Sequence, residues 1–189
     1  MNNRTDTLKQ YVSDMLAVER HIHEPVKRQR DDENTRQHPQ AHQLLTQLES
    51  ILDEHIANLE RHLESLGGSV ASPVKDAVTS VAGVAAGLYD KMRSEKLSKM
   101  LRDDYTALSL AAISYTMLHT TGLALNDQRT ADLSLRHLQH WTPMIVQISE
   151  IIPGVVVKEL TDDVPSISTS VTQQAVRNTQ QMWSREAVS

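Results

Sequence analysis

The sequence of 189 residues contains no cysteine and no phenylalanine, and only 3% of its residues are aromatic. Without cysteine the chain can form no disulfide, no thiolate metal site and no cysteine nucleophile. With so few aromatic residues, the core must be filled by Leu, Ile, Val, Met and Ala. Such a core suits helix-on-helix packing better than a β-sandwich, so we expect an all-α protein.

The sequence also lacks a basic stripe. Its net charge is −5, and its 19 lysine and arginine residues are scattered, so we expect no nucleic-acid partner. The uncharged stretch AVTSVAGVAAGLY, residues 77–89, is too short and too rich in Thr, Ser and Gly to span a bilayer. The opening residues, MNNRTDTLKQ, show no basic region followed by an apolar one. We therefore expect a cytoplasmic protein with no membrane partner.

Apolar residues recur at spacings of three and four in four segments, which is typical of amphipathic helices. The pattern predicts helices over approximately residues 6–30, 39–67, 95–125 and 126–153. The charged text between the first two, RQRDDENTRQH, is predicted to be a solvated loop. Elsewhere no alternation typical of a strand reaches comparable strength.

Local signals mark the ends of these helices. Pro25 is expected to kink the first helix. Pro39 is a good first-turn residue for the second, and Gly67-Gly68 is predicted to stop it. The fourth helix is predicted to start at the turn-and-cap pair Asn126-Asp127 and to stop at Pro153-Gly154.

Connection lengths predict the topology. The first and second helices, and the third and fourth, are joined by short links and should be antiparallel neighbours. Roughly 25 residues separate the second helix from the third, and they include the small-residue segment SVAGVAAGLYDKM. A helical crossover of that length would make these two helices parallel, which is the ferritin-like arrangement of a four-helix bundle. We expect residues 1–158 to form this bundle, and residues 159–189 to be a docking helix or tail anchored by Trp183.

Ionisable residues interrupt the apolar stripes, and each helix contributes at least one. They are Glu19, His55, Asp104, His137 and His140. Ferritin-like bundles bind two metal ions with a Glu from each of two helices and a Glu-x-x-His from each of the others. The second and fourth helices here contain no Glu-x-x-His, and the five residues supply only two carboxylates.

These residues leave two interpretations open. The set could bind one zinc or iron ion. Alternatively, the histidines are hydrogen-bonded core residues, with Glu19 pairing with one of them to fix the helix register and Asp104 at the rim of the bundle. If neither a metal ion nor a cationic partner faces Glu19, its replacement by leucine should be tolerated, because a buried unpaired carboxylate is costly.

Parts of the sequence resemble the YciF/YciE-type ferritin-like family over residues 8–152. The similar segments are YVSDMLAVERHIHEPV, LDEHIANLERHLESLGG, SPVKDAV and NDQRTADLSLRHL. The resemblance implies a four-helix ferritin-like fold, often dimeric and linked with stress responses, with Glu19 at the position of the first metal-ligand glutamate.

The chain departs from this family at the other metal ligands. Ala107 and Leu110 stand where further carboxylates are expected on the third helix. On the fourth helix the carboxylate cluster is replaced by LQHWTPM, in which His140 and Met144 lie near the expected places and Pro143 disturbs the helix. Only Glu19 of the family's ligands is present.

We therefore expect a non-catalytic bundle that acts as a structural or interaction protein, as a homodimer, with no cofactor. One alternative is a metal-binding protein with a histidine-rich centre that uses iron, zinc or manganese to handle oxidants or metals. The other is a helical adaptor that binds a larger protein partner through its C-terminal tail.

Overall fold

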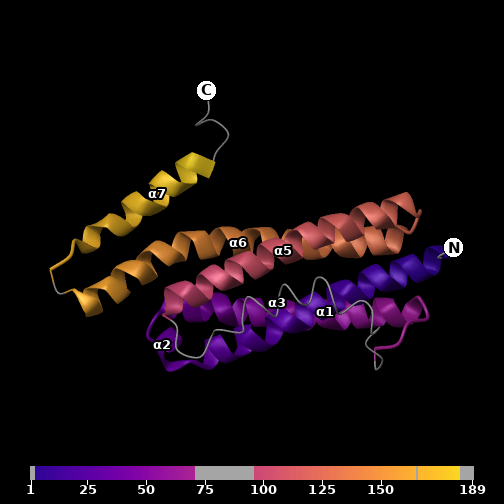
Figure 1. Cartoon of the computed structure of the whole chain (residues 1–189), viewed down its shortest axis with the longest axis horizontal. Helices are drawn as coiled ribbons and strands as arrows, with labels where there is room; N and C mark the ends of the chain where they lie inside the picture. The colour runs from indigo at the N-terminus through magenta and orange to yellow at the C-terminus, as the bar shows by residue number, and fades with distance from the viewer. Residues whose placement is uncertain (1–2, 71–95, 165, 184–189) are drawn as a thin grey trace.

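The computed structural model describes residues 3–70, 96–164 and 166–183, and in these ranges all regular structure is helical (Figure 1). Four long helices form a bundle: α1 (Arg4–Asp31), α3 (Pro39–Ser65), α5 (Leu97–Ala124) and α6 (Gln128–Asp163). Three short elements accompany them: α2 (Glu33–Arg36), the 3-10 turn η1 (Thr169–Val171) and α7 (Thr172–Trp183). The prediction of an all-α bundle is confirmed for these ranges.

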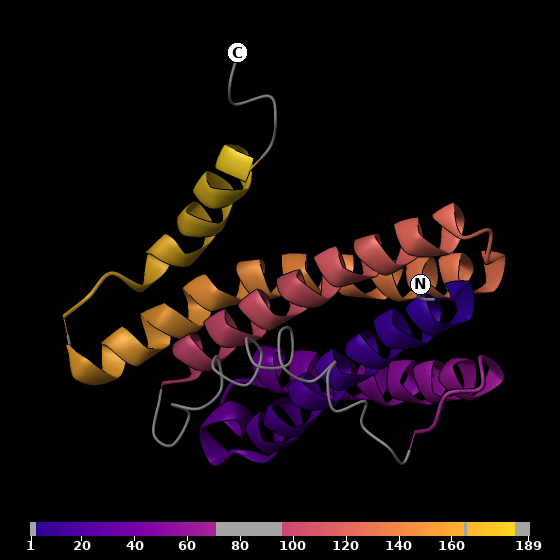
Figure 2. The ribbon, with the colours of Figure 1, turned by 45° about the vertical axis from the view of Figure 1, so that its right-hand side comes forward.

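The long helices form two antiparallel pairs. Helix α1 packs on α3, and α5 packs on α6, while the pairs meet through α1 on α5 and α3 on α6. Helices α3 and α5 run in the same direction, as the connection lengths predicted (Figures 1 and 2). The predicted helical crossover between them lies outside the described residues.

The core is aliphatic at most positions, as the composition predicted. Its largest fully buried side chains are nine leucines, one isoleucine, one tyrosine and one tryptophan: Leu8, Leu44, Leu45, Leu48, Leu52, Leu59, Leu101, Leu108, Leu118, Ile22, Tyr115 and Trp141. At one end, Gly122 lets α5 approach α6 closely, because a Cβ there would lie 2.7 Å from the backbone nitrogen of Ala131. None of the helices in the described ranges has the length and hydropathy that a bilayer span requires.

Two predicted helix boundaries are confirmed. Helix α3 begins at Pro39, and beyond its end Gly67 takes a φ of +77°, a left-handed conformation that favours glycine. Asn126 has a φ of +52°, and the side chain of Asp127 accepts a hydrogen bond of 2.8 Å from the backbone N–H of Thr130. After this turn and cap, α6 begins at Gln128, the residue that follows Asp127.

The charged link between the first two long helices is more ordered than predicted. Helix α1 extends to Asp31 and so takes in the first four residues of the link, and Glu33–Arg36 form α2, a single helical turn. The side chain of Asp32 accepts a hydrogen bond from the backbone N–H of Asn34 and so caps this turn. The many charged residues of this link predicted a solvated loop, but the cap formed by Asp32 allows part of the link to fold into a helical turn.

The predicted end of the fourth helix at Pro153-Gly154 is wrong, because α6 continues to Asp163. Tertiary contacts hold the extension. Glu159 accepts hydrogen bonds of 2.8 and 2.6 Å from the backbone N–H and hydroxyl of Ser98, and Lys158 donates one of 2.9 Å to the carbonyl of Gln37. These contacts offset the backbone hydrogen bond that Pro153 removes.

The tail predicted to begin at residue 159 therefore starts inside α6, and its residues Thr172–Trp183 form α7. Helix α7 has no buried residue. Gln180 donates a hydrogen bond of 2.7 Å to Glu150, and the ring centroid of Trp183 lies 6.1 Å from that of Tyr105. Trp183 nevertheless remains 59% exposed, so it contacts the bundle without being enclosed by it.

Candidate functional site

A cluster of polar and aromatic side chains crosses the middle of the bundle, and each long helix contributes to it. Glu19 comes from α1, His55 from α3 and Tyr115 from α5, while α6 supplies His137 and Trp141. All five are at most 1% exposed. We call these five residues the polar centre.

The carboxylate of Glu19 is the acceptor on which the polar centre converges. Its Oε1 accepts a hydrogen bond of 2.7 Å from the hydroxyl of Tyr115. The same oxygen accepts bonds of 3.1 Å from the indole N–H of Trp141 and 3.2 Å from Nδ1–H of His55. Three helices thus donate to one oxygen of the fourth. Such bonds compensate a buried carboxylate for much of its lost hydration.

The hydrogen bonds of His137 define its tautomer. Its Nδ1 lies 2.7 Å from the hydroxyl oxygen of Tyr115, whose single proton goes to Glu19. His137 must therefore donate through Nδ1–H, which leaves Nε2 to accept from the amide of Asn58 at 3.5 Å. Burial lowers the pKa of His137 to about 2, and His55, His140 and Arg136 add to this effect. His137 is consequently neutral at physiological pH.

Tyr115 also keeps its proton. Burial, followed by the charge and hydrogen bond of Glu19, raises the pKa of Tyr115 well above its ordinary value. The hydroxyl therefore stays a donor to Glu19 and an acceptor from His137 over the whole physiological range. It connects α1 to α6 through α5.

His140 connects the polar centre to the surface. It is only half-buried, and its Nδ1 lies 3.0 Å from Nε2 of His55. One of these two nitrogens donates to the other. A continuous path of hydrogen bonds thus leads from Glu19 through His55 to a histidine that water can reach.

The structure brings together four of the five ionisable residues that the sequence singled out. Glu19, His55 and His137 are in contact in the polar centre, with His140 at its edge. Asp104 lies apart, eleven residues before Tyr115 on α5, a separation of about 16 Å along a helix. It is fully buried there and accepts a hydrogen bond of 3.1 Å from the side-chain amide of Gln29.

Sequence reasoning did not assign two of the donors, Tyr115 and Trp141, to this site. Tyr115 falls on the apolar stripe of its helix, but a buried tyrosine hydroxyl needs a hydrogen-bond partner, and that requirement could have pointed to this residue. From His137 the helical period leads equally well to position 140 or 141. The stripe was placed through His140, whereas the fully buried residue is Trp141.

The polar centre does not fit the dinuclear metal centre that the family resemblance implies. A bridged pair of metal ions in such a bundle uses four glutamates and two histidines. Among the described residues, the one group close enough to share a metal ion consists of Glu19, His55 and His137, whose ligand atoms all lie within 4.8 Å of one another. It contains a single carboxylate.

A single ion fits this group only after a rearrangement. The imidazoles of His55 and His137 are stacked, with ring centroids 3.7 Å apart and planes inclined by 1°. Nitrogen lone pairs lie in the ring plane, so those of two parallel stacked rings do not converge on one ion at the usual distance of about 2.0–2.1 Å. One ring would have to turn and give up its present hydrogen bonds.

One oxygen of the polar centre has no partner. Glu19 Oε2 is buried and makes no hydrogen bond, although Oε1 accepts three. This oxygen is the place at which a cation could approach the carboxylate without displacing a donor. This unpartnered oxygen is the observation that supports the alternative of a site for a single metal ion.

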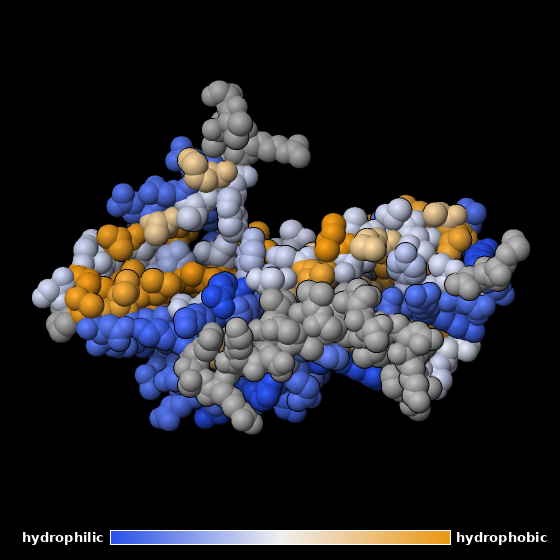
Figure 3. All heavy atoms as spheres, viewed as in Figure 1, coloured by the Kyte–Doolittle hydropathy of each residue, from blue (hydrophilic) through white to orange (hydrophobic). Residues whose placement is uncertain are grey.

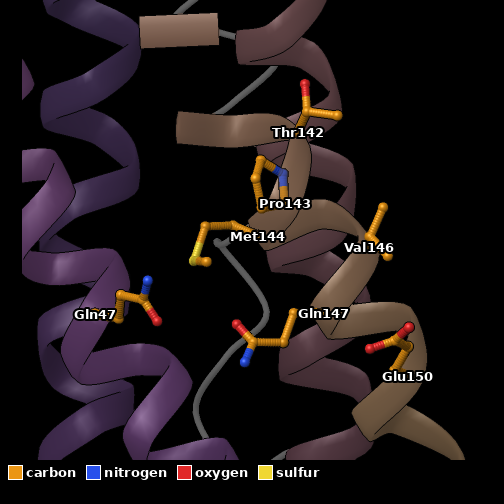
Figure 4. Close-up of a pocket in the computed structure, with 7 residues that line it drawn as sticks. All are labelled: Gln47, Thr142, Pro143, Met144, Val146, Gln147 and Glu150. Atoms are coloured by element: carbon orange, nitrogen blue, oxygen red, sulfur yellow. The ribbon is translucent and has the colours of Figure 1, made fainter. Parts of the chain in front are cut away.

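A pocket close to the polar centre in the bundle does not belong to it. It has a volume of about 500 Å³ and lies between α3 and α6, where Gln47 faces Met144 and Gln147 (Figure 4). None of the five residues of the polar centre lines it, and its lining carries only one charged side chain, Glu150. The pocket therefore gives no ligand access to Glu19.

Comparison with known proteins adds no identity. No family model matches the sequence, and no curated protein matches it at a significant level.

Proposed function

We propose that this chain is a non-catalytic ferritin-like bundle that acts as a structural or interaction protein, with a hydrogen-bonded polar centre in place of a dinuclear metal site. The parallel course of α3 and α5 supports the ferritin-like arrangement. The observation that carries the functional proposal is the satisfaction of Glu19 Oε1 by Tyr115, Trp141 and His55. A carboxylate held by protein donors from three helices stabilises the bundle without a metal ion.

The chemistry of the polar centre agrees with a structural role. Its neutral imidazole, its protonated phenol and its single carboxylate are buried, and none of the five residues lines the pocket between α3 and α6. A reaction needs a substrate within reach of its acid, base or nucleophile. The exposed Met182 and Trp183 of α7, by contrast, offer contact area to another protein, as the adaptor alternative requires.

Metal analysis tests this proposal. The untagged protein should be purified from cells supplied with iron, zinc and manganese, and its metal content measured by mass spectrometry. We expect much less than one equivalent of any of these metals. About one or two retained equivalents, lost in the His137→Ala/His140→Ala variant, would overturn the proposal.

A second candidate function is the binding of one divalent cation, with iron, zinc or manganese as the metals to consider. It is favoured by the unpartnered Glu19 Oε2 and by the proximity of His55 and His137. The carboxylate and imidazoles would hold the ion, which would supply Lewis-acid or redox chemistry.

Titration distinguishes this candidate. Each metal is added to protein stripped with a chelator, and the rise in thermal unfolding temperature is measured. A rise in the native protein that is absent in Glu19→Gln and present in the control Asp104→Asn would establish a cation site at the polar centre. No rise at any concentration would exclude it.

A further inference from the structure

Helix α5 contains an unusually long stretch without charge. From Tyr105 to Asn126 the sequence YTALSLAAISYTMLHTTGLALN has no Asp, Glu, Lys or Arg. The buried side of such a stretch needs no charge, but its outer side faces solvent. Two of its large apolar residues are among the most exposed in the described ranges: Ile113 at 56% and Met117 at 53%.

The exposed residues of this stretch form a regular stripe. Thr106, Leu110, Ile113, Met117, Thr120 and Ala124 follow one another at spacings of 4, 3, 4, 3 and 4 residues. Leu110 is half-buried and the other five are exposed. This is the spacing of a coiled-coil seam, in which two helices pack side by side. We call these six residues the outer stripe.

The outer stripe is distinct from the stripe that packs inside the bundle. The buried side of the same helix consists of other positions, among them Leu108, Ala111, Tyr115 and Leu118. Helix α5 is thus apolar on two sides. In Figure 3 hydrophobic patches lie over α5 and α6, whereas the surface over α1 and α3 below them is mostly hydrophilic.

The spacing of the outer stripe, 4, 3, 4, 3 and 4 residues, is the same from either end. The two bulky exposed residues, Ile113 and Met117, lie in the middle, and the small Thr106 and Ala124 lie at the ends. If a second α5 packs against it in the opposite direction, Ile113 meets Met117, Leu110 meets Thr120, and Thr106 meets Ala124. Every position then has a partner over about 27 Å of helix. A two-fold axis requires this self-complementarity.

Charge favours a second copy over other occupants. Each chain carries a net charge of −5, which opposes self-association, but the outer stripe carries no charge, so a second copy can pack there without bringing like charges into direct contact. A basic partner would be attracted to acidic side chains, which the stripe lacks. A membrane surface would call for lysines and arginines beside the apolar residues, and none occurs between Tyr105 and Asn126.

The direction of packing follows from the remaining charges of α5. Its four charged residues, Lys99, Arg102, Asp103 and Asp104, all precede Tyr105. A parallel arrangement would bring the exposed Lys99 and Arg102 of both copies together. The antiparallel arrangement places them beyond the far end of the partner's stripe.

We propose that the outer stripe of α5 is a homodimer interface, in which two copies pack antiparallel about a two-fold axis level with Tyr115. The proposed function includes the formation of a homodimer, and this inference places the dimer interface on α5. It rests on the proposed function only in assuming that the chain self-associates. Metal binding and dimer formation are measured separately, so the failure of one leaves the other to be judged on its own.

Disulfide trapping tests the register, and the absence of native cysteine makes it unambiguous. Purified Ile113→Cys and Met117→Cys variants are oxidised alone and as an equal mixture. We expect the mixture to give a covalent heterodimer several-fold faster than either variant gives a homodimer. Leu110→Cys with Thr120→Cys should behave in the same way. A Lys27→Cys variant, on the exposed side of α1, is the control and should stay monomeric.

Charge insertion tests the interface itself. By analytical ultracentrifugation we expect the native chain to be a dimer at micromolar concentration. Ile113→Lys should weaken it on the order of a hundredfold, because two lysines would enter the centre of the contact. Leu123→Lys is the matched control, since Leu123 is 51% exposed on the same helix but lies off the stripe. It should leave the dimer intact, and circular dichroism confirms that both variants fold.

Three results would overturn the proposal. The first is a native chain that stays monomeric up to about 100 μM, a concentration at which even weak specific dimers form. The second is a dimer that Leu123→Lys disrupts as strongly as Ile113→Lys. The third is faster trapping of the separate cysteine variants than of their mixture.

Discussion

One turn of α5 presents two opposite surfaces. Tyr115 points into the bundle, where it is fully buried and bonds to Glu19 and His137. Ile113 and Met117, two residues to either side, are more than half exposed. Polar atoms therefore lie inside and apolar atoms outside, the reverse of the usual distribution. Hydrogen bonds between helices compensate the cost of burying the polar atoms around Tyr115. In the described part of the chain, nothing covers the exposed apolar side chains of Ile113 and Met117.

The largest effect expected on the inner side comes from Glu19→Leu. This change leaves the hydroxyl of Tyr115, the indole N–H of Trp141 and Nδ1–H of His55 without an acceptor. We expect the free energy of unfolding to fall by about 3 kcal/mol or more, because each unsatisfied buried donor costs about 1–3 kcal/mol. Urea denaturation measures it. The isosteric Glu19→Gln should lose less, since its carbonyl still accepts.

From the sequence, leucine at position 19 was predicted to be tolerated if neither a metal ion nor a cationic partner faced Glu19. The structure leads to the opposite expectation. That prediction considered only the cost of an unpaired carboxylate. In the structure Glu19 has three donors, and their loss outweighs the relief of removing its charge. A Glu19→Leu variant as stable as the native chain would show that these bonds do not hold the helices together.

A smaller effect is expected from Tyr115→Phe. The change removes one donor to Glu19 and leaves Nδ1–H of His137 without an acceptor, at a cost of about 1–3 kcal/mol in unfolding free energy. Tyr105→Phe is the matched control on the same helix, because Tyr105 is half-buried and its ring packing is retained. Equal losses in the two variants would contradict the role given to the Tyr115 hydroxyl.

The pH dependence of stability should reveal the neutral His137. Its pKa is about 2 in the folded chain and near 6.5 when unfolded, so only the unfolded state binds the proton between these values. Stability is therefore full above pH 6.5 and is lost as the pH falls, by about 1.4 kcal/mol per pH unit for one proton. His137→Gln should remove this contribution from denaturation curves recorded between pH 8 and 5. An unchanged slope would mean that His137 is not held neutral.

The smallest effect concerns Asp14, a half-buried residue of α1 whose Oδ1 makes no hydrogen bond. Burial raises the pKa of this carboxyl from 3.8 to about 6. Because the folded state holds the proton more tightly, stability falls as the pH rises from 3.8 through 6. Asp14→Asn should thus stabilise the chain at pH 7 by about 0.5 kcal/mol, since solvent screens a half-exposed group. The gain should vanish near pH 3.5, and a gain that persists there would have another cause.

The helices could be predicted because their apolar period and their end signals depend on residues that are close together in the sequence. Pro39 and Gly67 bound α3, and Asp127 caps the start of α6, as their side-chain chemistry dictates. The end of α6 was not predictable from Pro153-Gly154. The contacts of Glu159 and Lys158 that carry the helix past this pair come from residues about 60 and 120 positions away.

The sequence predicted most of the ionisable residues of the candidate site, but it did not predict the hydrogen bonds between them. Ionisable groups within apolar stripes pointed to Glu19, His55 and His137, because such groups are rarely buried without partners. Which partner each one finds depends on the relative rotation and height of four helices. For that reason Asp104 was grouped with them although it lies well apart, and Trp141 was left out. The apolar period predicts one buried side for each helix, so it gives no sign of the second apolar side that α5 presents to solvent.

The central claim is that donors from other helices hold the carboxylate of Glu19, and the two indoles of the chain test it directly. Trp141 is buried and donates to Glu19, whereas Trp183 is largely exposed. In ¹⁵N-labelled protein, with Trp183→Phe for assignment, we expect the Trp141 indole proton to exchange with solvent far more slowly than that of Trp183. Its resonance should shift clearly in Glu19→Gln. Equal exchange of the two indoles, or a Trp141 resonance indifferent to Glu19→Gln, would contradict the account.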